Sequence, residues 1–235
     1  MKELIKIILN IFDFFTQQKI LKALNKKFKN NNISILIDVG SHKGEYINSI
    51  KKKFKIQSIY GFEPNPDIFK ILKKNTLDKN INIFNYGISD ENGKINFYKN
   101  LETSSSSINK LNKDSKYYKK KYFLLNFFNF KEVETRIDID VIRLDDFIKS
   151  QKIYIIDLIK IDTEGFEFKV LKSLGEKIQN VKIVHFEHHF DDMIIKNYKL
   201  TNIHKYLIKK GFIKFFKIKM KFRKSFEYLY VNKNL

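Results

Sequence analysis

Short apolar runs alternate with helical patterns over most of this chain. The first run, Ile33 to Asp38, ends in an acidic residue and leads into apolar positions at helical spacing. Four further runs read as strands: Ile56 to Phe62, Ile81 to Tyr86, Leu158 to Asp162 and Val181 to Phe186. Continuous apolar strands are typical of parallel sheets with both faces covered by helices. The pattern therefore predicts an α/β fold with a mostly parallel sheet.

Two regions depart from this rhythm. Residues 101–133 form a serine-rich and aromatic-rich irregular stretch, and long loops inside a compact domain usually serve function. We expect an acceptor-binding insertion or a lid there. Glu134 to Leu144 alternates like an exposed strand, and Phe212 to Lys221 with Phe226 to Asn232 predicts a terminal antiparallel hairpin.

The first 32 residues read as an amphipathic helical extension, which leaves 33–235 as one domain. The segment from Leu4 to Phe15 is strongly apolar but too short to span a bilayer, and no small-residue cleavage site follows it. We expect this helix to pack on the domain or on a second subunit of a homo-oligomer. The alternative is a helix lying on a membrane surface. We expect a cytoplasmic protein. If the helix lies on a membrane surface, the protein would be peripheral to that membrane.

The turn after the first strand carries the first candidate chemistry. Its G-x-x-x-G spacing, Gly40 to Gly44, lacks the third glycine of a dinucleotide fingerprint. Asp38 directly before the turn disfavours phosphate and suits a cationic ligand such as S-adenosylmethionine. Glu63 follows the second strand, where a carboxylate can accept hydrogen bonds from both ribose hydroxyls. We therefore expect cofactor contacts from these residues and from the loop residues Ser41 and His42.

Polar residues also follow the later strands. Ser89 and Asp90 are expected to meet the adenine edge of the cofactor. Asp162, Glu164 and His189 are the candidates for a general base or for positioning the acceptor. A carboxylate and imidazole set of Asp162, Glu187 and His189 is an alternative that would hold a divalent metal.

Composition narrows the partners. The chain has a formal charge of +20, but its only arginines are Arg136, Arg143 and Arg223. Arginine makes most bidentate phosphate and base contacts, so a nucleic-acid partner is not expected. Scattered lysines leave long-range attraction of an anionic substrate or membrane open. Cysteine is absent, which excludes disulfides, thiolate catalysis and cysteine-ligated zinc.

Acidic residues follow three of the predicted strands, at Asp38, Glu63 and Asp162, and the chain ends in a predicted two-stranded hairpin. This arrangement resembles that of class I S-adenosylmethionine-dependent methyltransferases. More narrowly, the chain resembles the FkbM methyltransferase family over about residues 33–190. The resemblance rests on I-D-V-G-S-H-K-G-E-Y, F-E-P-N-P, N-Y-G-I-S-D, the serine cluster, V-I-R-L-D-D-F, L-I-K-I-D-T-E-G-F-E-F-K-V-L and H-F-E-H-H. The K-I-D-x-E-G-x-E block is the most specific of these. The family often has Ala-Asn at Ser41-His42, a departure that concerns loop contacts.

The resemblance implies a Rossmann-like, mostly parallel seven-stranded sheet with helices on both faces and a C-terminal antiparallel hairpin. It further implies that Gly40 to Gly44 and Glu63 cradle S-adenosylmethionine. The implied reaction is methyl transfer, mostly to a hydroxyl oxygen of a sugar, glycan or secondary metabolite. The acceptor itself is not implied.

Three other readings compete with this one. Ser104 and the Tyr117-x-x-x-Lys121 spacing are reminiscent of short-chain oxidoreductases, but they fall in the irregular stretch and the glycine fingerprint is missing. A catalytically inactive, methyltransferase-like module could instead bind anionic polymer or membrane through its lysines. A nucleic-acid methyltransferase is disfavoured because the N-P-P-Y type of motif is absent.

Overall fold

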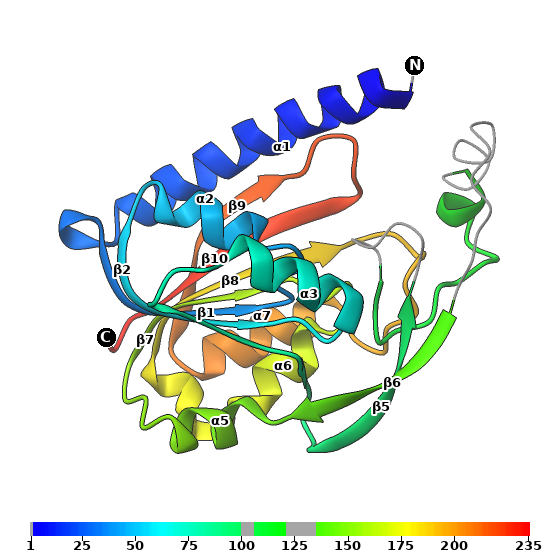
Figure 1. Cartoon of the computed structure of the whole chain (residues 1–235). Coiled ribbons are helices and arrows are strands. Elements are labelled where there is room, and N and C mark those ends of the chain that lie inside the picture. The colour runs from blue at the N-terminus through cyan, green and yellow to red at the C-terminus, as the bar shows by residue number, and fades with distance from the viewer. Residues whose placement is uncertain (1, 100–105, 121–134) are drawn as a thin grey trace.

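A computed structural model of the chain describes residues 2–99, 106–120 and 135–235, with side chains described from residue 11 onward. A seven-stranded sheet forms its centre, with strand order β3-β2-β1-β7-β8-β10-β9 (Figure 1). Its strands are β1 Asn32–Val39, β2 Lys55–Phe62, β3 Ile81–Phe84, β7 Ile156–Ile161, β8 Val181–His189, β9 Phe212–Lys219 and β10 Ser225–Asn232. Only β10 runs against the others among these strands, because it pairs antiparallel with both β8 and β9. The predicted mostly parallel sheet and terminal hairpin are confirmed.

Helices cover both faces of this sheet (Figure 1). The helices are α1 Lys2–Asn25, α2 Glu45–Lys51, α3 Pro66–Asn75, α5 Leu144–Ser150, α6 Glu167–Ser173 and α7 Leu200–Lys209, with short 3-10 helices at Lys29–Asn31 and Gly175–Asn180. Successive residues of a strand point to opposite faces. Leu36 of β1 therefore packs with α1 and α2, whereas its neighbour Ile37 packs with α5, α6 and α7. The continuous apolar strands of the sequence are explained by these two cores.

The entry to α3 shows how local chemistry starts a helix at the edge of the sheet. Asn65 is the N-cap, and its side-chain oxygen accepts a hydrogen bond from the backbone N–H of Asp67 at 3.1 Å. Pro66 occupies the first helical position. A backbone N–H at this position has no partner within the helix, so proline loses no hydrogen bond there. Glu63 lies between the end of β2 and this cap, two residues before Asn65. The cap therefore helps fix the position of its carboxylate.

A second, three-stranded sheet was not predicted. It consists of β4 Gly87–Ile88, β5 Gly93–Lys99 and β6 Thr135–Ile142 in the order β4-β6-β5. The alternating segment around β6 was read correctly as a strand, but its partners come from a distant part of the sequence. Much of the expected lid lies outside the described residues; the described part, 106–120, packs against Met193 and Ile194.

The N-terminal helix is joined to the domain core through its second half. Ile20, Leu21 and Leu24 are buried in the same cluster as residues of β1 and α2. Its first half runs above the β9–β10 hairpin (Figure 1). There the Phe12 ring meets the Phe222 ring edge-on at 5.1 Å. The helix is therefore one wall of the domain.

None of the described helices is both long and apolar enough to cross a bilayer.

Candidate active site

A cavity of about 760 Å³ opens at the carboxyl ends of the parallel strands. Residues of the β1 turn and of β2 line one part of it, and residues of β7, β8, β10 and α1 line the other. This is where open α/β sheets bind ligands, and the volume is within the range of about 300–1,000 Å³ for ligand pockets. We call the two parts the cofactor half and the acceptor half.

The cofactor half is organised by the turn after β1. Gly40 has φ +84°, and a Cβ there would lie 1.9 Å from the carbonyl oxygen of Asp162. Only glycine fits between the turns after β1 and β7. The N–H groups of Gly40 and Ser41 both donate to the carbonyl of Phe62 at 2.9 Å. The turn is thus held flat against two neighbouring strands, with room above it for a ligand.

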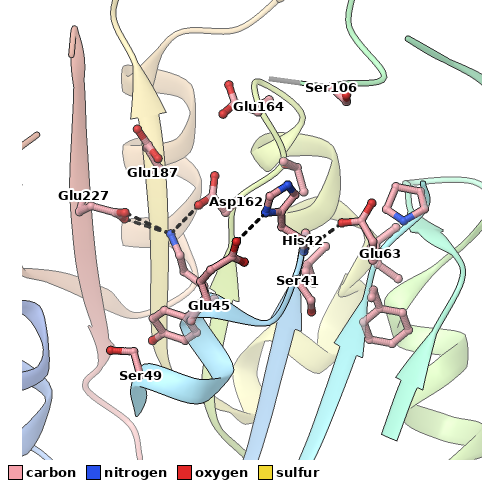
Figure 2. A pocket seen from close by; sticks show the side chains of 18 of the residues that line it. Ser41, His42, Glu45, Ser49, Glu63, Ser106, Asp162, Glu164, Glu187 and Glu227 are labelled. Atoms are coloured by element: carbon pink, nitrogen blue, oxygen red, sulfur yellow. Dashed lines mark hydrogen bonds and ion pairs between the residues drawn. The ribbon is translucent and has the colours of Figure 1, made fainter. Parts of the chain in front are cut away.

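Glu63 stands at the end of β2 and faces this turn (Figure 2). Its two carboxylate oxygens accept hydrogen bonds from the backbone N–H groups of His42 at 3.0 Å and Asn65 at 2.8 Å. Burial raises the pKa of Glu63 to about 7, against the opposing effect of these donors. Each oxygen keeps a further lone pair for a ligand hydroxyl. The predicted role in holding a ribose fits this geometry.

Asp38 lies beneath the turn. It is buried, does not line the cavity, and neither side-chain oxygen has a hydrogen-bond partner within the described part of the chain. Burial raises its pKa to about 7. Ser41 does line the cavity, and its hydroxyl donates to the Asp38 carbonyl at 2.9 Å. The structure therefore places Asp38 behind the turn that Ser41 presents to the cavity, and not in the cavity wall.

Ser89 and Asp90 lie away from the cavity. The hydroxyl of Ser89 donates to Asp90 at 3.2 Å, and the carboxylate of Asp90 pairs with Lys169 at 3.2 Å. Gly87 and Ile88, just before them, line the cavity instead. The sequence pointed to this loop, but of its residues the structure places Gly87 and Ile88, not Ser89 and Asp90, in the cavity wall.

The acceptor half is built around a buried ammonium group. Lys160 in β7 lies 3.4 Å from Asp162 Oδ2 and 3.1 Å from Glu227 Oε2 (Figure 2). Carboxylate oxygens of Asp162, Glu187 and Glu227 all lie within 4.8 Å of one another. Burial opposes the charge on Lys160, but the carboxylates of Asp162 and Glu227 outweigh it and raise the pKa of Lys160. The lysine is therefore the internal counter-ion of this cluster.

A second layer of contacts fixes Glu227. His185 Nε2 lies 2.9 Å from Glu227 Oε2, and the Tyr46 hydroxyl lies 3.1 Å from His185 Nδ1. Burial lowers the pKa of His185, so the neutral ring suits the site. Such a ring accepts from the Tyr46 hydroxyl at Nδ1 and turns its N–H edge, at Nε2, toward Glu227. Although burial acts to raise it, the pKa of Glu227 is lowered by Lys160 and His185.

His189 lies behind the cluster and not in the cavity wall. Its Nε2 is 3.3 Å from Glu164 and 3.5 Å from Glu187, and its Nδ1 is 3.6 Å from Asp191. Burial opposes its charge, but the carboxylates, Glu164 first, raise the pKa of His189 to about 10. Burial lowers the pKa of the preceding His188 to about 3. The raised pKa favours the protonated ring at neutral pH. A protonated His189 balances the charge of the carboxylates around it, but it cannot act as a general base.

The expected metal set is only partly brought together. Asp162 and Glu187 do converge, but the third residue within ligand distance is Glu227, not His189. Lys160 already supplies a positive charge to Asp162 and Glu227. The donor set therefore fits an internal ammonium at this place better than a divalent ion.

Residues of the K-I-D-T-E-G-F-E block either line the cavity or stabilise the turn after β7. Asp162 and Glu164 line the cavity, and their side chains are 36% and 17% exposed. Glu167 is buried, and its carboxylate accepts from the Gly165 N–H at 2.8 Å, which stabilises the turn. Lys160 and Glu227 were missed by sequence reasoning. A lysine inside an apolar strand was an available signal for the first, whereas nothing local marks the second.

Strand order, the glycine turn and the acidic residue after β2 define a class I S-adenosylmethionine-dependent methyltransferase. The chain belongs to the FkbM family within that class, because the family model described as "Methyltransferase FkbM domain" matches residues 38–214.

A curated relative, the hexuronic acid methyltransferase AglP of Haloferax volcanii, is 27% identical over 181 residues. The match covers 76% of this chain and 65% of that protein, so the chain spans somewhat less than two thirds of its relative.

Solved structures agree on the fold. A methyltransferase FkbM from Methylobacillus flagellatus KT superposes with a TM-score of 0.54 at 14% identity, covering 87% of this chain and 45% of that one. TrmK of M. capricolum in complex with S-adenosyl-homocysteine gives 0.51 at 12% identity, covering 93% and 68%. A Streptococcus pneumoniae protein, Sp1610, a putative tRNA (m1A22) methyltransferase, gives 0.51 at 13% identity, covering 92% and 68%.

Proposed function

We propose that this protein transfers a methyl group from S-adenosylmethionine to a hydroxyl oxygen of a sugar. The observation that carries the proposal is the position of Asp162. Its carboxylate lines the cavity between the cofactor half and the acceptor half, and Lys160 holds it from below. The curated relative acts on a hexuronic acid, which supports a sugar acceptor.

The residues of the cofactor half fit the proposed cofactor. A Cβ at Gly40 would overlap the carbonyl oxygen of Asp162, so glycine lets the turn after β1 lie close to the turn after β7 in the wall of the cavity. Glu63 would hold the ribose, and Ser41 and His42 would border it. Asp38 and Glu63 are buried carboxyl groups, and burial raises the pKa of each to about 7. A ligand carrying sulfonium and ammonium groups would bring positive charge close to them and so favour their ionised forms.

The bound cofactor supplies an electrophilic methyl carbon on sulfur. The protein must align an acceptor hydroxyl with that carbon and assist the loss of its proton. We assign proton acceptance to Asp162, while a carbon–oxygen bond forms and the carbon–sulfur bond breaks. Glu164, which also lines the cavity, would orient the acceptor. His189 would keep Glu164 and Glu187 in place through its positive charge.

We further propose that Lys160 takes the part that a divalent metal would play beside Asp162. An ammonium within 3.4 Å of that carboxylate attracts and orients it without any exchangeable ion. Activity should accordingly persist after treatment with a chelator and should not rise when magnesium or manganese is added.

The first test is calorimetric titration of the full chain with S-adenosylmethionine. Glu63→Ala should weaken binding by about 1–3 kcal/mol, the range for hydrogen bonds to charged groups. Glu91→Ala, at an exposed position outside the cavity, is the matched control. Folded protein that does not bind the cofactor would contradict the proposal. Transfer of labelled methyl groups to sugars, with RNA as the competing acceptor, would then test the reaction.

An inactive binding module remains the second candidate, and one observation favours surface contact. Ile11, Phe14, Phe15 and Phe222 are 48%, 58%, 57% and 70% exposed, on α1 and the β9–β10 turn. Exposed aromatics among lysines suit the surface of an anionic membrane. Vesicle co-sedimentation would test the contact. A module without catalysis should bind in a salt-dependent way and be indifferent to Glu63→Ala.

A further inference from the structure

The far wall of the acceptor half comes from parts of the chain with no family motif. Asp13 and Gln17 of α1, with Met220 and Arg223 beside the β9–β10 turn, line the cavity there. The β9–β10 turn belongs to the end of the sheet that follows β8, and Figure 2 shows Glu227 of β10 and Glu63 of β2 on opposite sides of Asp162. A cofactor held at Glu63 therefore leaves this wall free for the acceptor.

The wall is a defined structure. Arg223 Nη2 pairs with Asp13 Oδ2 at 2.7 Å, across 210 positions of sequence. The pair ties the overhanging half of α1 to the hairpin, and the Phe12–Phe222 ring contact lies beside it. The Arg223 and Asp13 side chains keep 43% and 31% of their surface exposed. Both are therefore fixed in position and still open to a ligand.

Charge decides which ligand fits. The described cations of the acceptor half already have carboxylate partners: Lys160 has Asp162 and Glu227, and Arg223 has Asp13. An anionic ligand would have to displace one of those carboxylates and would face the others. Hydroxyl groups have no such difficulty, because each can donate to a carboxylate and accept from a guanidinium or an amide.

We propose that α1 and the β9–β10 turn form an acceptor subsite for an uncharged sugar, whose hydroxyls bond to Asp13, Gln17 and Arg223. This inference rests on the proposed function and specifies its substrate class. The Asp13–Arg223 pair is then the specificity element. With Asp13 neutralised, Arg223 is released and the same wall should accept a sugar carboxylate.

The test is titration of the full chain, saturated with S-adenosylhomocysteine, with methyl glucoside and with methyl glucuronide. We expect the glucoside to bind about 10-fold more tightly, and Arg223→Gln to weaken it about 5- to 10-fold. Asp13→Asn should reverse the preference toward the glucuronide. Lys205→Gln, exposed on the distant helix α7, should change neither affinity. S-adenosylhomocysteine should bind all four proteins equally.

The outcomes separate the two proposals. If the parent chain fails to bind S-adenosylhomocysteine, the proposed function is wrong and the subsite falls with it. If that ligand binds but neither sugar does, or if the variants leave sugar affinity unchanged, the subsite is wrong and the proposed function stands. Tighter binding of the glucuronide to the parent chain would overturn the argument from charge.

Discussion

The two halves of the cavity are built on different physical principles. The cofactor half comes from one turn and the end of the next strand, and backbone groups define its shape. The acceptor half takes Lys160, Glu187 and Glu227 from three strands and Asp13 from α1, and side-chain charges define it. The first half is therefore sensitive to changes in backbone shape, and the second to changes in charge.

The halves also differ in how they treat buried carboxylates. Burial raises the pKa of Asp38 and Glu63 to about 7, because the opposing effects of the described groups around them offset it only in part. In the acceptor half, Lys160 outweighs burial and lowers the pKa of Glu227. A sulfonium ligand would thus add to a compensation that is only partial in the cofactor half, whereas Lys160 already supplies it in the acceptor half.

The largest effect should come from Gly40→Ala. The new Cβ would overlap the Asp162 carbonyl oxygen, and the backbone at φ +84° is strained for alanine. We expect a loss of about 3 kcal/mol or more in the free energy of unfolding, with cofactor binding abolished. Denaturant unfolding and calorimetry measure both. Gly93→Ala, where nothing lies within 4 Å of the new Cβ, separates backbone strain from overlap. Equal losses at the two sites would contradict the close approach described.

Lys160→Met tests the charge principle of the acceptor half. The change leaves Asp162 and Glu227 without their buried counter-ion, so we expect a loss of about 3–5 kcal/mol in stability. Methyl transfer should also fall, and a divalent ion should restore part of the stability. Lys149→Met removes an exposed pair with Asp146 and should change stability by about 1 kcal/mol or less. A variant as stable and active as the parent would contradict the role of Lys160.

The charge on His189 predicts a pH dependence. Its pKa is raised to about 10 in the folded protein, above the ordinary value of 6.5. The stability it contributes is therefore fully present below pH 6.5 and is lost as the pH rises through about 10. We expect a loss of about 1–3 kcal/mol on that rise, measured by denaturant unfolding. His189→Gln should remove this part of the slope. An identical slope in the variant would mean that the ring is not charged.

The smallest effect should come from Asp90→Asn. The carboxylate of Asp90 pairs with Lys169 outside the cavity, so its charge matters little to a ligand. We expect a change of less than about 1 kcal/mol in cofactor binding by calorimetry. A larger loss would return Asp90 to the adenine contact that the sequence first suggested.

Local patterns explain which features were predictable. The strands, the glycine turn and Glu63 follow from hydrophobic spacing and turn chemistry within short segments. Asp162 and Glu187 were placed together correctly, because parallel strands bring their carboxyl ends to one edge. Their contact with Glu227 was missed, since its strand β10 runs antiparallel and enters the same edge from the opposite direction.

The sequence by itself determined the class of fold, the family and, in the cofactor half, the glycine turn and Glu63, because these depend on residues close together along the chain. Only the tertiary structure decided the acceptor half. There the pairing of Asp13 with Arg223, and of Lys160 with Glu227, joins residues far apart in sequence. Such pairs produce no periodic pattern in the sequence. Which opposite charge a residue will meet is settled only by the folded chain. The physical reason is that electrostatic balance depends on distance in space and not on distance along the chain.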